Sequence, residues 1–333
     1  MIRTISAMYG RGAMWRRRWY ASDPRRRRRL VRPVISVGNL RVGGSGKTPA
    51  VACIARILLD AGEHPAILTR GYARRTPSAG TTVVSDGRAI LASADAAGDE
   101  PLLLARLLPG VPVLVSADRY LSGRLAEERF GATVHILDDG FQHHELARNA
   151  DLLLTSEEDL SDGPLPAGHL REPLEAGAAA DAVLVPAGYA TAAERIGRAL
   201  GVEPAFRVTH ALGVPRAIAG DRETVVVPAG ARVFAAAGIA RPERFVSDLI
   251  SVGWEVVGTM LFRDHHQFTN ADVGRIAAAA RAARTAIVLT TEKDAIRFEA
   301  CDLAGLPIAA VPLVTSIEPA AAFRAWLLAR LAA

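Results

Sequence analysis

Cysteines and long apolar runs are scarce in this sequence, and each absence excludes a class of protein. The 333 residues contain only two cysteines, Cys53 and Cys301, too few for a disulfide framework or for a zinc site built from closely spaced thiolates. The longest stretch without a charged residue covers residues 303–317, shorter than the roughly 18 residues that a membrane-spanning helix needs. The sequence therefore predicts a protein of a reducing compartment without a transmembrane helix.

The N-terminus also lacks a secretory signal. Residues 1–19 are interrupted by Arg3, Arg11 and the run Arg16–Arg18, so they contain no apolar core of about 7–15 residues. Half of the chain is hydrophobic and 23% is charged, which predicts an ordered protein, and the length predicts about two domains.

Charge is divided unevenly along the chain. Residues 1–34 hold eleven arginines and one acid, Asp23, whereas the remaining residues carry 29 basic against 34 acidic side chains. This division predicts a basic arm on an acidic body, and phosphates or anionic lipid are the partners that such an arm attracts.

The basic arm, residues 1–30, has the pattern of a helix that lies on a membrane. A helix over residues 1–20 would place five residues on one face, namely Ile5, Met8, Gly12, Trp15 and Trp19. Tryptophan prefers headgroup depth and arginine pairs with anionic lipid, so a membrane surface is the favoured partner. A solvated tail is the plainer alternative, and contact of Arg25–Arg29 with nucleic acid is a third. The acidic body and the absence of aromatic residues within that run predict no nucleic-acid partner.

Short β-branched runs alternate with helical patterns from residue 33 onward, which predicts an α/β fold with buried parallel strands. Strands are predicted at residues 34–37, 66–69, 111–115, 133–137, 151–154, 182–186, 232–237, 254–260, 286–289 and 308–313, and helices at 48–59, 119–130, 241–251, 271–284 and 319–332. Residues 205–230 contain several Gly and Pro breakers and no helical period, so they are predicted to form a connecting β ribbon. The expected domains are a parallel-sheet domain at 31–210 and a smaller α/β domain at 211–333 that includes this ribbon.

The strand at residues 34–37 leads through a glycine-rich loop into a helix, as a P-loop requires. In such a loop, backbone N–H groups of Gly43, Gly44, Ser45 and Gly46 surround phosphate oxygens, Lys47 reaches the β- and γ-phosphates, and Thr48 can hold Mg²⁺. The strict pattern has glycine where this chain has Arg41. The sequence still predicts a P-loop NTPase-like domain; the alternative is a glycine-rich turn with an incidental Gly-Lys-Thr.

A second candidate for metal binding follows the strand at residues 133–137, where Asp138 and Asp139 are adjacent. Ligands of open α/β sheets bind at the carboxyl ends of the strands, and a P-loop enzyme needs an acid there for Mg²⁺. An Asp-Asp-Gly turn is the alternative. A zinc site at His143 and His144 is disfavoured, because adjacent side chains diverge and no cysteine is near.

A kinase needs, in addition, a group that takes the proton of an acceptor hydroxyl. Asp99 begins an apolar helix and could serve, although capping of that helix is an equally ordinary role. His265 or His266, after a strand of the second domain, offers an imidazole. The order of letters in Thr291-Glu292-Lys293-Asp294 argues against guanine recognition, so ATP is the expected nucleotide.

Together these segments resemble the tetraacyldisaccharide 4'-kinase family. The run from Pro33 to Pro49 carries the resemblance, with Arg41 as the same departure from the strict P-loop. Further matches are Leu68–Tyr72, Gly98–Pro101, Ala117–Arg119, Leu137–His143, Pro164–Gly168, Leu170–Pro173, Gly238–Ala240, Asp264–His265 and Thr291–Asp294. They span nearly the whole body of the chain.

The resemblance implies ATP- and Mg²⁺-dependent phosphorylation of the 4'-hydroxyl of lipid A disaccharide-1-phosphate, at the cytoplasmic face of the bacterial inner membrane. It implies phosphate and Mg²⁺ binding by Lys47 and Thr48, and metal-side carboxylates at Asp138, Asp139 and Glu172. Asp99 would be the base, helped by His265. Substrate or phosphate contacts would come from Arg119, Gln142, His143 and Arg171.

The N-terminal helix is shorter and richer in arginine than is usual in that family, which predicts a larger electrostatic share in membrane binding. A membrane-associated P-loop ATPase that switches partners, rather than modifying a lipid, is the alternative function.

Overall fold

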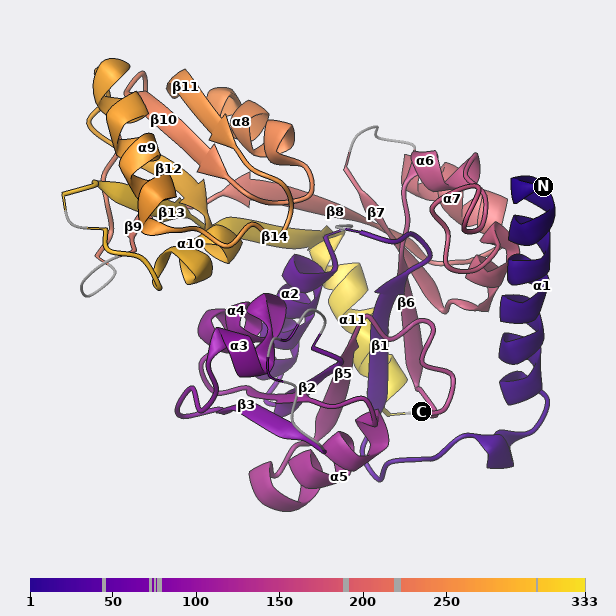
Figure 1. The fold of residues 1–333 in the computed structure, drawn as a ribbon. Helices are drawn as coiled ribbons and strands as arrows, with labels where there is room; N and C mark the ends of the chain where they lie inside the picture. The colour runs from indigo at the N-terminus through magenta and orange to yellow at the C-terminus, as the bar shows by residue number, and fades with distance from the viewer. Residues whose placement is uncertain are drawn as a thin grey trace. The chain divides into compact units, whose positions relative to one another are not determined.

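The computed structural model describes residues 1–43, 46–71, 74, 76, 80–187, 192–218, 223–303 and 305–332. The chain divides into two compact units (Figure 1). The first comprises Met1–Thr209 and Thr315–Ala333, and the second comprises His210–Val314.

The nine-stranded sheet has the order β14-β8-β7-β6-β1-β5-β2-β4-β3. Its inner strands from β8 to β4 pair in parallel, and the edge strand β3 pairs with β4 antiparallel. The strands are β1 (Val34–Asn39), β2 (Pro65–Thr69), β3 (Thr82–Asp86), β4 (Pro112–Val115), β5 (Val134–Asp138), β6 (Ala150–Leu154), β7 (Ala182–Pro186), β8 (Ala205–Leu212) and β14 (Leu313–Glu318). This topology confirms the predicted parallel sheet.

Helix α1 precedes the sheet, and the other helices of the first unit follow strands, as expected of βαβ connections. The helices of this unit are α1 (Ile2–Ala21), α2 (Lys47–Asp60), α3 (Ala94–Ala97), α4 (Asp99–Leu107), α5 (Arg119–Phe130), α6 (Glu157–Leu160), α7 (Ala192–Leu200) and α11 (Ala320–Leu331), with 3₁₀ turns η1 (Pro24–Arg26) and η2 (Leu174–Ala179). Helix α5 begins at a sequence signal, because the Asp118 side chain accepts hydrogen bonds from Tyr120 N and Leu121 N. Strands β1, β2, β4, β5 and β6 are buried at every position, which requires cover on both faces.

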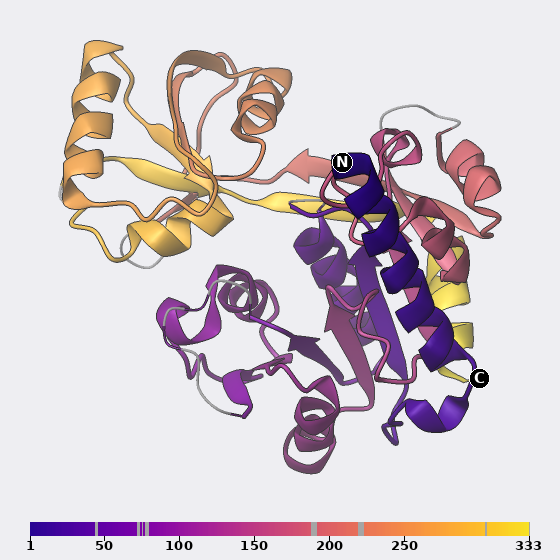
Figure 2. The same ribbon diagram turned by 45° about the vertical axis from the view of Figure 1, so that its right-hand side comes forward.

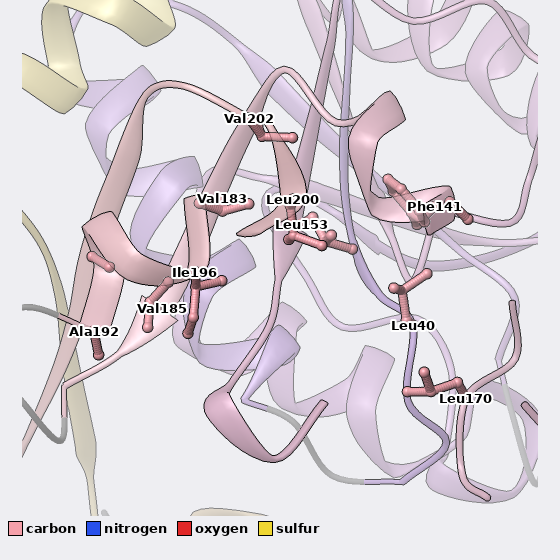
Figure 3. Close-up of a cluster of buried hydrophobic side chains, with 12 residues drawn as sticks. Leu40, Phe141, Leu153, Leu170, Val183, Val185, Ala192, Ile196, Leu200 and Val202 are labelled. Carbon is pink, nitrogen blue, oxygen red and sulfur yellow. The ribbon is translucent and has the colours of Figure 1, made fainter. Parts of the chain in front are cut away.

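Buried apolar side chains hold three loop segments against one part of the sheet. Leu40 follows β1, Phe141 follows β5, and Leu170 lies in the loop between α6 and η2; all three are fully buried in one cluster that also contains side chains of β6, β7 and α7 (Figure 3). Gly38 allows this packing, since a Cβ there would lie 2.6 Å from both N and Cβ of Phe141. The core therefore fixes where the residues next to these three side chains lie.

The second unit is a smaller α/β structure with a five-stranded sheet of order β11-β10-β12-β13-β9. All pairs are parallel except that of β9 with β13. Its elements are β9 (Arg216–Ala217), β10 (Arg232–Ala237), α8 (Pro242–Ser251), β11 (Glu255–Leu261), α9 (Asn270–Ala282), β12 (Val288–Thr291), α10 (Glu292–Phe298) and β13 (Ile308–Val311).

The chain leaves the first unit within β8 and returns to it within β14. The predicted boundary, which gave all of residues 211–333 to the second domain, was therefore wrong at its end. Helix α11 packs on the first unit, because the Phe323 ring meets that of Phe206 at 5.0 Å and Arg330 pairs with Asp181. Among the described residues of the ribbon predicted at 205–230, the strands are β8 and β9.

Candidate functional site

The described residues of the glycine-rich loop after β1 include two glycines with the left-handed backbone that suits a phosphate cradle. Gly43 and Gly46 both have positive φ, +98° and +81°, a region that costs glycine little. Gly46 is the N-cap of α2, so Lys47 and Thr48 are its first two helical residues and lie at the positive end of its dipole. Gly44 and Ser45 lie outside the described residues.

Arg41 replaces the glycine of the strict P-loop pattern, and it ties the loop to the segment around α6. Its Nε lies 2.7 Å from Asp159 Oδ1 and its Nη2 lies 2.9 Å from Asp162 Oδ2. The hydrogen bond with Asp159 raises the pKa of Arg41 above its ordinary value. The departure from the pattern thus supplies a second anchor for the loop.

Four neighbouring parallel strands are followed by polar residues at the carboxyl edge of the sheet. In the order β1-β5-β2-β4, the residues at or just after the strand ends are Asn39, the pair Asp138–Asp139, Thr69 with Arg70, and Arg119. Val37 and Asp138 are register partners, so the acidic pair ends beside the phosphate loop. This is the edge where open α/β sheets bind ligands.

The two aspartates at this edge differ in protonation. Burial, followed by the charges of Glu100 and Asp139, raises the pKa of Asp138 to about 7. Burial acts in the same sense on Asp139, but the hydrogen bonds from Arg171 and the charge of Lys47 outweigh it and lower the pKa of Asp139 to about 2. Asp139 is therefore the permanent anion of the pair, and Asp138 is poised to gain or lose a proton.

A network around Asn39 joins the loop lysine to Arg171. Lys47 Nζ donates to Asn39 Oδ1 at 3.0 Å and lies 3.5 Å from Asp139 Oδ1. Arg171 donates to both Asp139 oxygens, at 2.8 and 2.7 Å, and also to Asn39 Oδ1. Gln142 Nε2 donates to the Asn39 carbonyl at 3.0 Å. Asn39 was not among the predicted site residues, although it is the polar end of a buried strand, the same signal that identified Asp138.

Glu172 is held by a cation from the N-terminal helix. Its Oε2 accepts from Arg17 Nε at 2.6 Å, and its Oε1 lies 3.4 Å from His144 Nε2. Burial opposes ionisation, yet hydrogen bonds from His144 and Arg17 lower the pKa of Glu172. Its predicted place beside a metal ion stays a prediction.

The first turn of α4 contains Glu100, whose charge helps to raise the pKa of Asp138. Gly98 occupies the N-cap of this helix and Asp99 is its first residue. The capping role considered for Asp99 thus falls to Gly98.

Arg119 and His143 each have a buried nitrogen that lacks a hydrogen-bond partner among the described residues. Arg119 is 4% exposed, and its Nε has no partner among the described residues. Burial and the charge of Arg70 lower its pKa to about 10. His143 Nε2 is buried and, within the same described ranges, also lacks a partner. A buried guanidinium in this state is suited to an anionic ligand.

Replacing His143 with glutamine is expected to make the protein less sensitive to acid. Burial, then the charges of Arg119 and Arg148, lowers the pKa of His143 to about 3, whereas an unfolded histidine takes up a proton below about pH 6.5. Because only the unfolded chain binds this proton, the wild type loses roughly 1–2 kcal/mol as pH falls from about 6.5 to 5. Thermal unfolding across this range measures the difference.

The matched control is His64→Gln at an exposed position, which should keep the acid sensitivity of the wild type. Equal acid losses in the wild type and His143→Gln would contradict the lowered pKa.

In the second unit, His265 lies between two cations. Its Nδ1 is 3.3 Å from Arg297 Nη2, and its Nε2 is 3.4 Å from Lys293 Nζ. His265 has φ +60°, an uncommon backbone for a non-glycine residue. His266 stacks on Phe262 and its Nε2 lies 3.1 Å from Asp272 Oδ2. The two histidines left open by the sequence thus differ, and His266 is engaged in packing.

The polar groups around the phosphate loop carry oxygen atoms, the ligands that Mg²⁺ prefers. In proteins, Mg²⁺ is usually bound by one or two carboxylates together with water and phosphate oxygens. Thr48 supplies a hydroxyl, and Asp138 and Asp139 supply carboxylates. Within the described ranges, no group of three or more His, Cys, Asp or Glu side chains forms an all-protein metal site. The hydroxyl and carboxylate oxygens present fit a metal that is held jointly with nucleotide phosphates.

Known proteins are similar to this chain in sequence and in fold. The sequence profile of the Tetraacyldisaccharide-1-P 4'-kinase (LpxK) family matches residues 1–332. The tetraacyldisaccharide 4'-kinase of Syntrophus aciditrophicus is 39% identical over 339 residues, which cover 97% of this chain and 90% of that protein. The enzyme of the same name from Geobacter metallireducens is 38% identical over 323 residues, covering 96% and 94%.

Among solved structures, the crystal structure of LpxK from Aquifex aeolicus in complex with ATP is similar to this one, with a TM-score of 0.78 and 32% identity over 98% of each chain. The profile match includes the phosphate loop and the Asp138–Asp139 pair. The chain therefore belongs to the tetraacyldisaccharide 4'-kinase family.

Proposed function

We propose that this kinase transfers the γ-phosphate of ATP to the 4'-hydroxyl of lipid A disaccharide-1-phosphate at the carboxyl edge of the nine-stranded sheet. The observation that carries the proposal is the network of Lys47, Asn39, Asp139 and Arg171 beside the phosphate loop. Two cations and a carboxylate meet there at a helix N-terminus, which is where a transferring phosphoryl group needs positive charge and a metal ligand.

When ATP binds, Lys47 and Arg171 are proposed to give up part of their contact with Asp139 and to contact phosphate oxygens instead. Thr48, with Asp138 and Asp139, would hold Mg²⁺, which neutralises phosphate charge when bound. Arg119, Gln142 and His143 are proposed to contact the acceptor or a phosphate. In the described part of the chain, one buried nitrogen of Arg119, one of His143 and the buried Oε1 of Gln142 have no hydrogen-bond partner.

Asp99 is proposed as the base that takes the proton of the acceptor hydroxyl, because it begins α4 next to Glu100, whose charge acts on the pKa of Asp138. His265 is proposed to assist Asp99, because the pair Asp264–His265 is the one that matches the family. Positioning and charge neutralisation supply most of the catalysis in such a reaction.

Helix α1 is proposed to rest on the cytoplasmic face of the inner membrane. Figure 2 shows this helix lying across the first unit. Its buried residues are Ser6, Gly10 and Arg17. Its exposed large side chains include Ile5, Met8, Trp15 and Trp19. In the described chain, no helix combines the length and the hydropathy needed to span a bilayer. An exposed apolar face rimmed by arginines is the pattern of an interfacial helix.

Binding to anionic vesicles is expected to weaken steeply with salt. Each arginine near an anionic surface contributes about 1 kcal/mol, and that attraction is screened as the Debye length shortens. Sedimentation with anionic vesicles should show at least a tenfold loss of affinity from about 50 mM to about 500 mM salt. Zwitterionic vesicles are the control. Binding that does not change with salt would instead indicate apolar insertion.

The competing function, a P-loop ATPase switch, is separated from the kinase by acceptor dependence. ADP release is measured with ATP and Mg²⁺ in detergent, with and without the disaccharide-1-phosphate. The kinase predicts release that rises with acceptor concentration and saturates. Release at the same rate without acceptor would contradict the proposed function.

A further inference from the structure

Helix α1 contacts both loop segments that carry the nucleotide site. Gly10 packs on Pro164 and Pro173, where an added Cβ would lie 3.2 and 3.0 Å from their Cγ atoms. Arg16 donates to the Gln142 carbonyl at 3.3 Å and pairs with Glu145. The helix thus braces the loop after β5 and the loop before η2, which are distant in sequence.

Arg17 is the buried centre of this contact. Its side chain is 9% exposed, although it belongs to a helix whose other arginines are exposed. Its Nε pairs with Glu172, its Nη2 donates to the Phe141 carbonyl at 3.3 Å, and its guanidinium lies 4.3 Å from the centre of the Phe141 ring. A buried arginine cannot contact lipid, so membrane binding does not explain the position of Arg17. Its contacts inside the protein do.

The partners of Arg17 lead directly to the phosphate loop. Glu172 is adjacent to Arg171, which binds Asp139 and Asn39, and the Arg171 backbone N–H donates to the Leu40 carbonyl at 2.6 Å. Phe141 is two residues from Asp139. Removing one member of a buried ion pair leaves an uncompensated charge, so loss of Arg17 would displace Glu172 and, with it, Arg171.

We infer that Arg17 is a positioning residue for ATP: through Glu172 and the Phe141 carbonyl it fixes Arg171 and Asp139 beside the phosphate loop. The N-terminal helix is accordingly part of the nucleotide site as well as a membrane-facing element. The inference rests on the proposed role of this network in ATP binding.

The test compares Arg17→Gln with Arg18→Gln, its exposed neighbour on the same helix. Full-length proteins in detergent are measured for equilibrium ATP binding, for KM of ATP and of acceptor, for kcat and for thermal unfolding. Arg17→Gln is expected to raise the ATP dissociation constant and KM about tenfold while the KM of the acceptor changes less than about twofold. Arg18→Gln should match the wild type.

Arg17→Lys keeps the charge but cannot reach Glu172 and the Phe141 carbonyl as a planar fork does, so it should lie between Arg17→Gln and the wild type. It also serves if Arg17→Gln does not fold. ATP binding like that of the wild type in folded Arg17→Gln or Arg17→Lys would overturn the inference. A loss of kcat in proportion to stability, with KM unchanged, would overturn it too.

Binding is measured without turnover, so the two proposals can fail separately. If the wild type transfers no phosphate to lipid but Arg17→Gln still binds ATP more weakly, only the proposed function fails. If the wild type transfers phosphate and Arg17→Gln binds ATP normally, only the role of Arg17 fails.

Discussion

Replacing Asp99 with asparagine is expected to lower kcat by about 10²–10⁴-fold while ATP affinity stays within about twofold of the wild type. The amide keeps the size of the side chain but cannot accept the proton of the acceptor hydroxyl. Asp99 is the first residue of α4, next to Glu100, whose charge reaches Asp138. Steady-state kinetics with the lipid acceptor and equilibrium binding of ATP measure the two effects separately.

The matched control is Asp95→Asn, an exposed carboxylate in the preceding short helix, which should retain activity. His265→Gln should lower kcat less than Asp99→Asn. If His265 acts through Asp99 as proposed, the double variant should be no slower than Asp99→Asn. Asp99→Asn that loses ATP binding as strongly as turnover would contradict the assignment of Asp99 as the base.

Replacing Lys47 with alanine is expected to lower kcat/KM by about 10²–10³-fold and to weaken ATP binding as well. The ammonium is the loop's cation, lying 3.0 Å from Asn39 Oδ1 and 3.5 Å from Asp139 Oδ1, so it contributes both in the ground state and as charge shifts during transfer. Equilibrium binding of ATP and steady-state kinetics of the purified variant test both parts.

The scarcity of lysine in this chain suggests a second substitution at the same position. Of 40 basic residues, 38 are arginines, and the two lysines are Lys47 and Lys293. A compact ammonium differs in shape from a planar guanidinium, so Lys47→Arg should not restore activity. Arg56→Ala, which removes an exposed cation from the same helix, should have little effect. Full ATP binding by Lys47→Ala would show that the loop does not hold the phosphates.

The strand-loop-helix at the phosphate loop could be predicted because its signals are local. Val34–Val37 reads as a buried strand, and the glycines with Lys47 and Thr48 follow directly; β1 and α2 lie where the pattern placed them, within a residue or two. Asp138 was found for the same reason, as the polar end of an apolar run. Asn39 satisfies that criterion too, but an asparagine at a strand end is also an ordinary turn residue.

Long-range contacts account for what the sequence could not predict. The arginine pattern of α1 indicates a basic helix, yet nothing local distinguishes Arg17, which is buried against Glu172, from exposed Arg18. The return of β14 and α11 to the first unit depends on pairing across the sheet and on the contact of Phe323 with Phe206. Strand β3 has only two fully buried positions at the sheet's edge, too weak a pattern to be identified.

Transfer of label from γ-labelled ATP tests the central claim most directly. Purified protein in detergent is incubated with Mg²⁺ and lipid A disaccharide-1-phosphate, and the extracted lipid is examined for label on the 4'-oxygen. We expect labelled lipid with the wild type and, in the same time, at least about a hundredfold less with Asp99→Asn. Label released only as free phosphate, at the same rate with and without the lipid, would contradict the account.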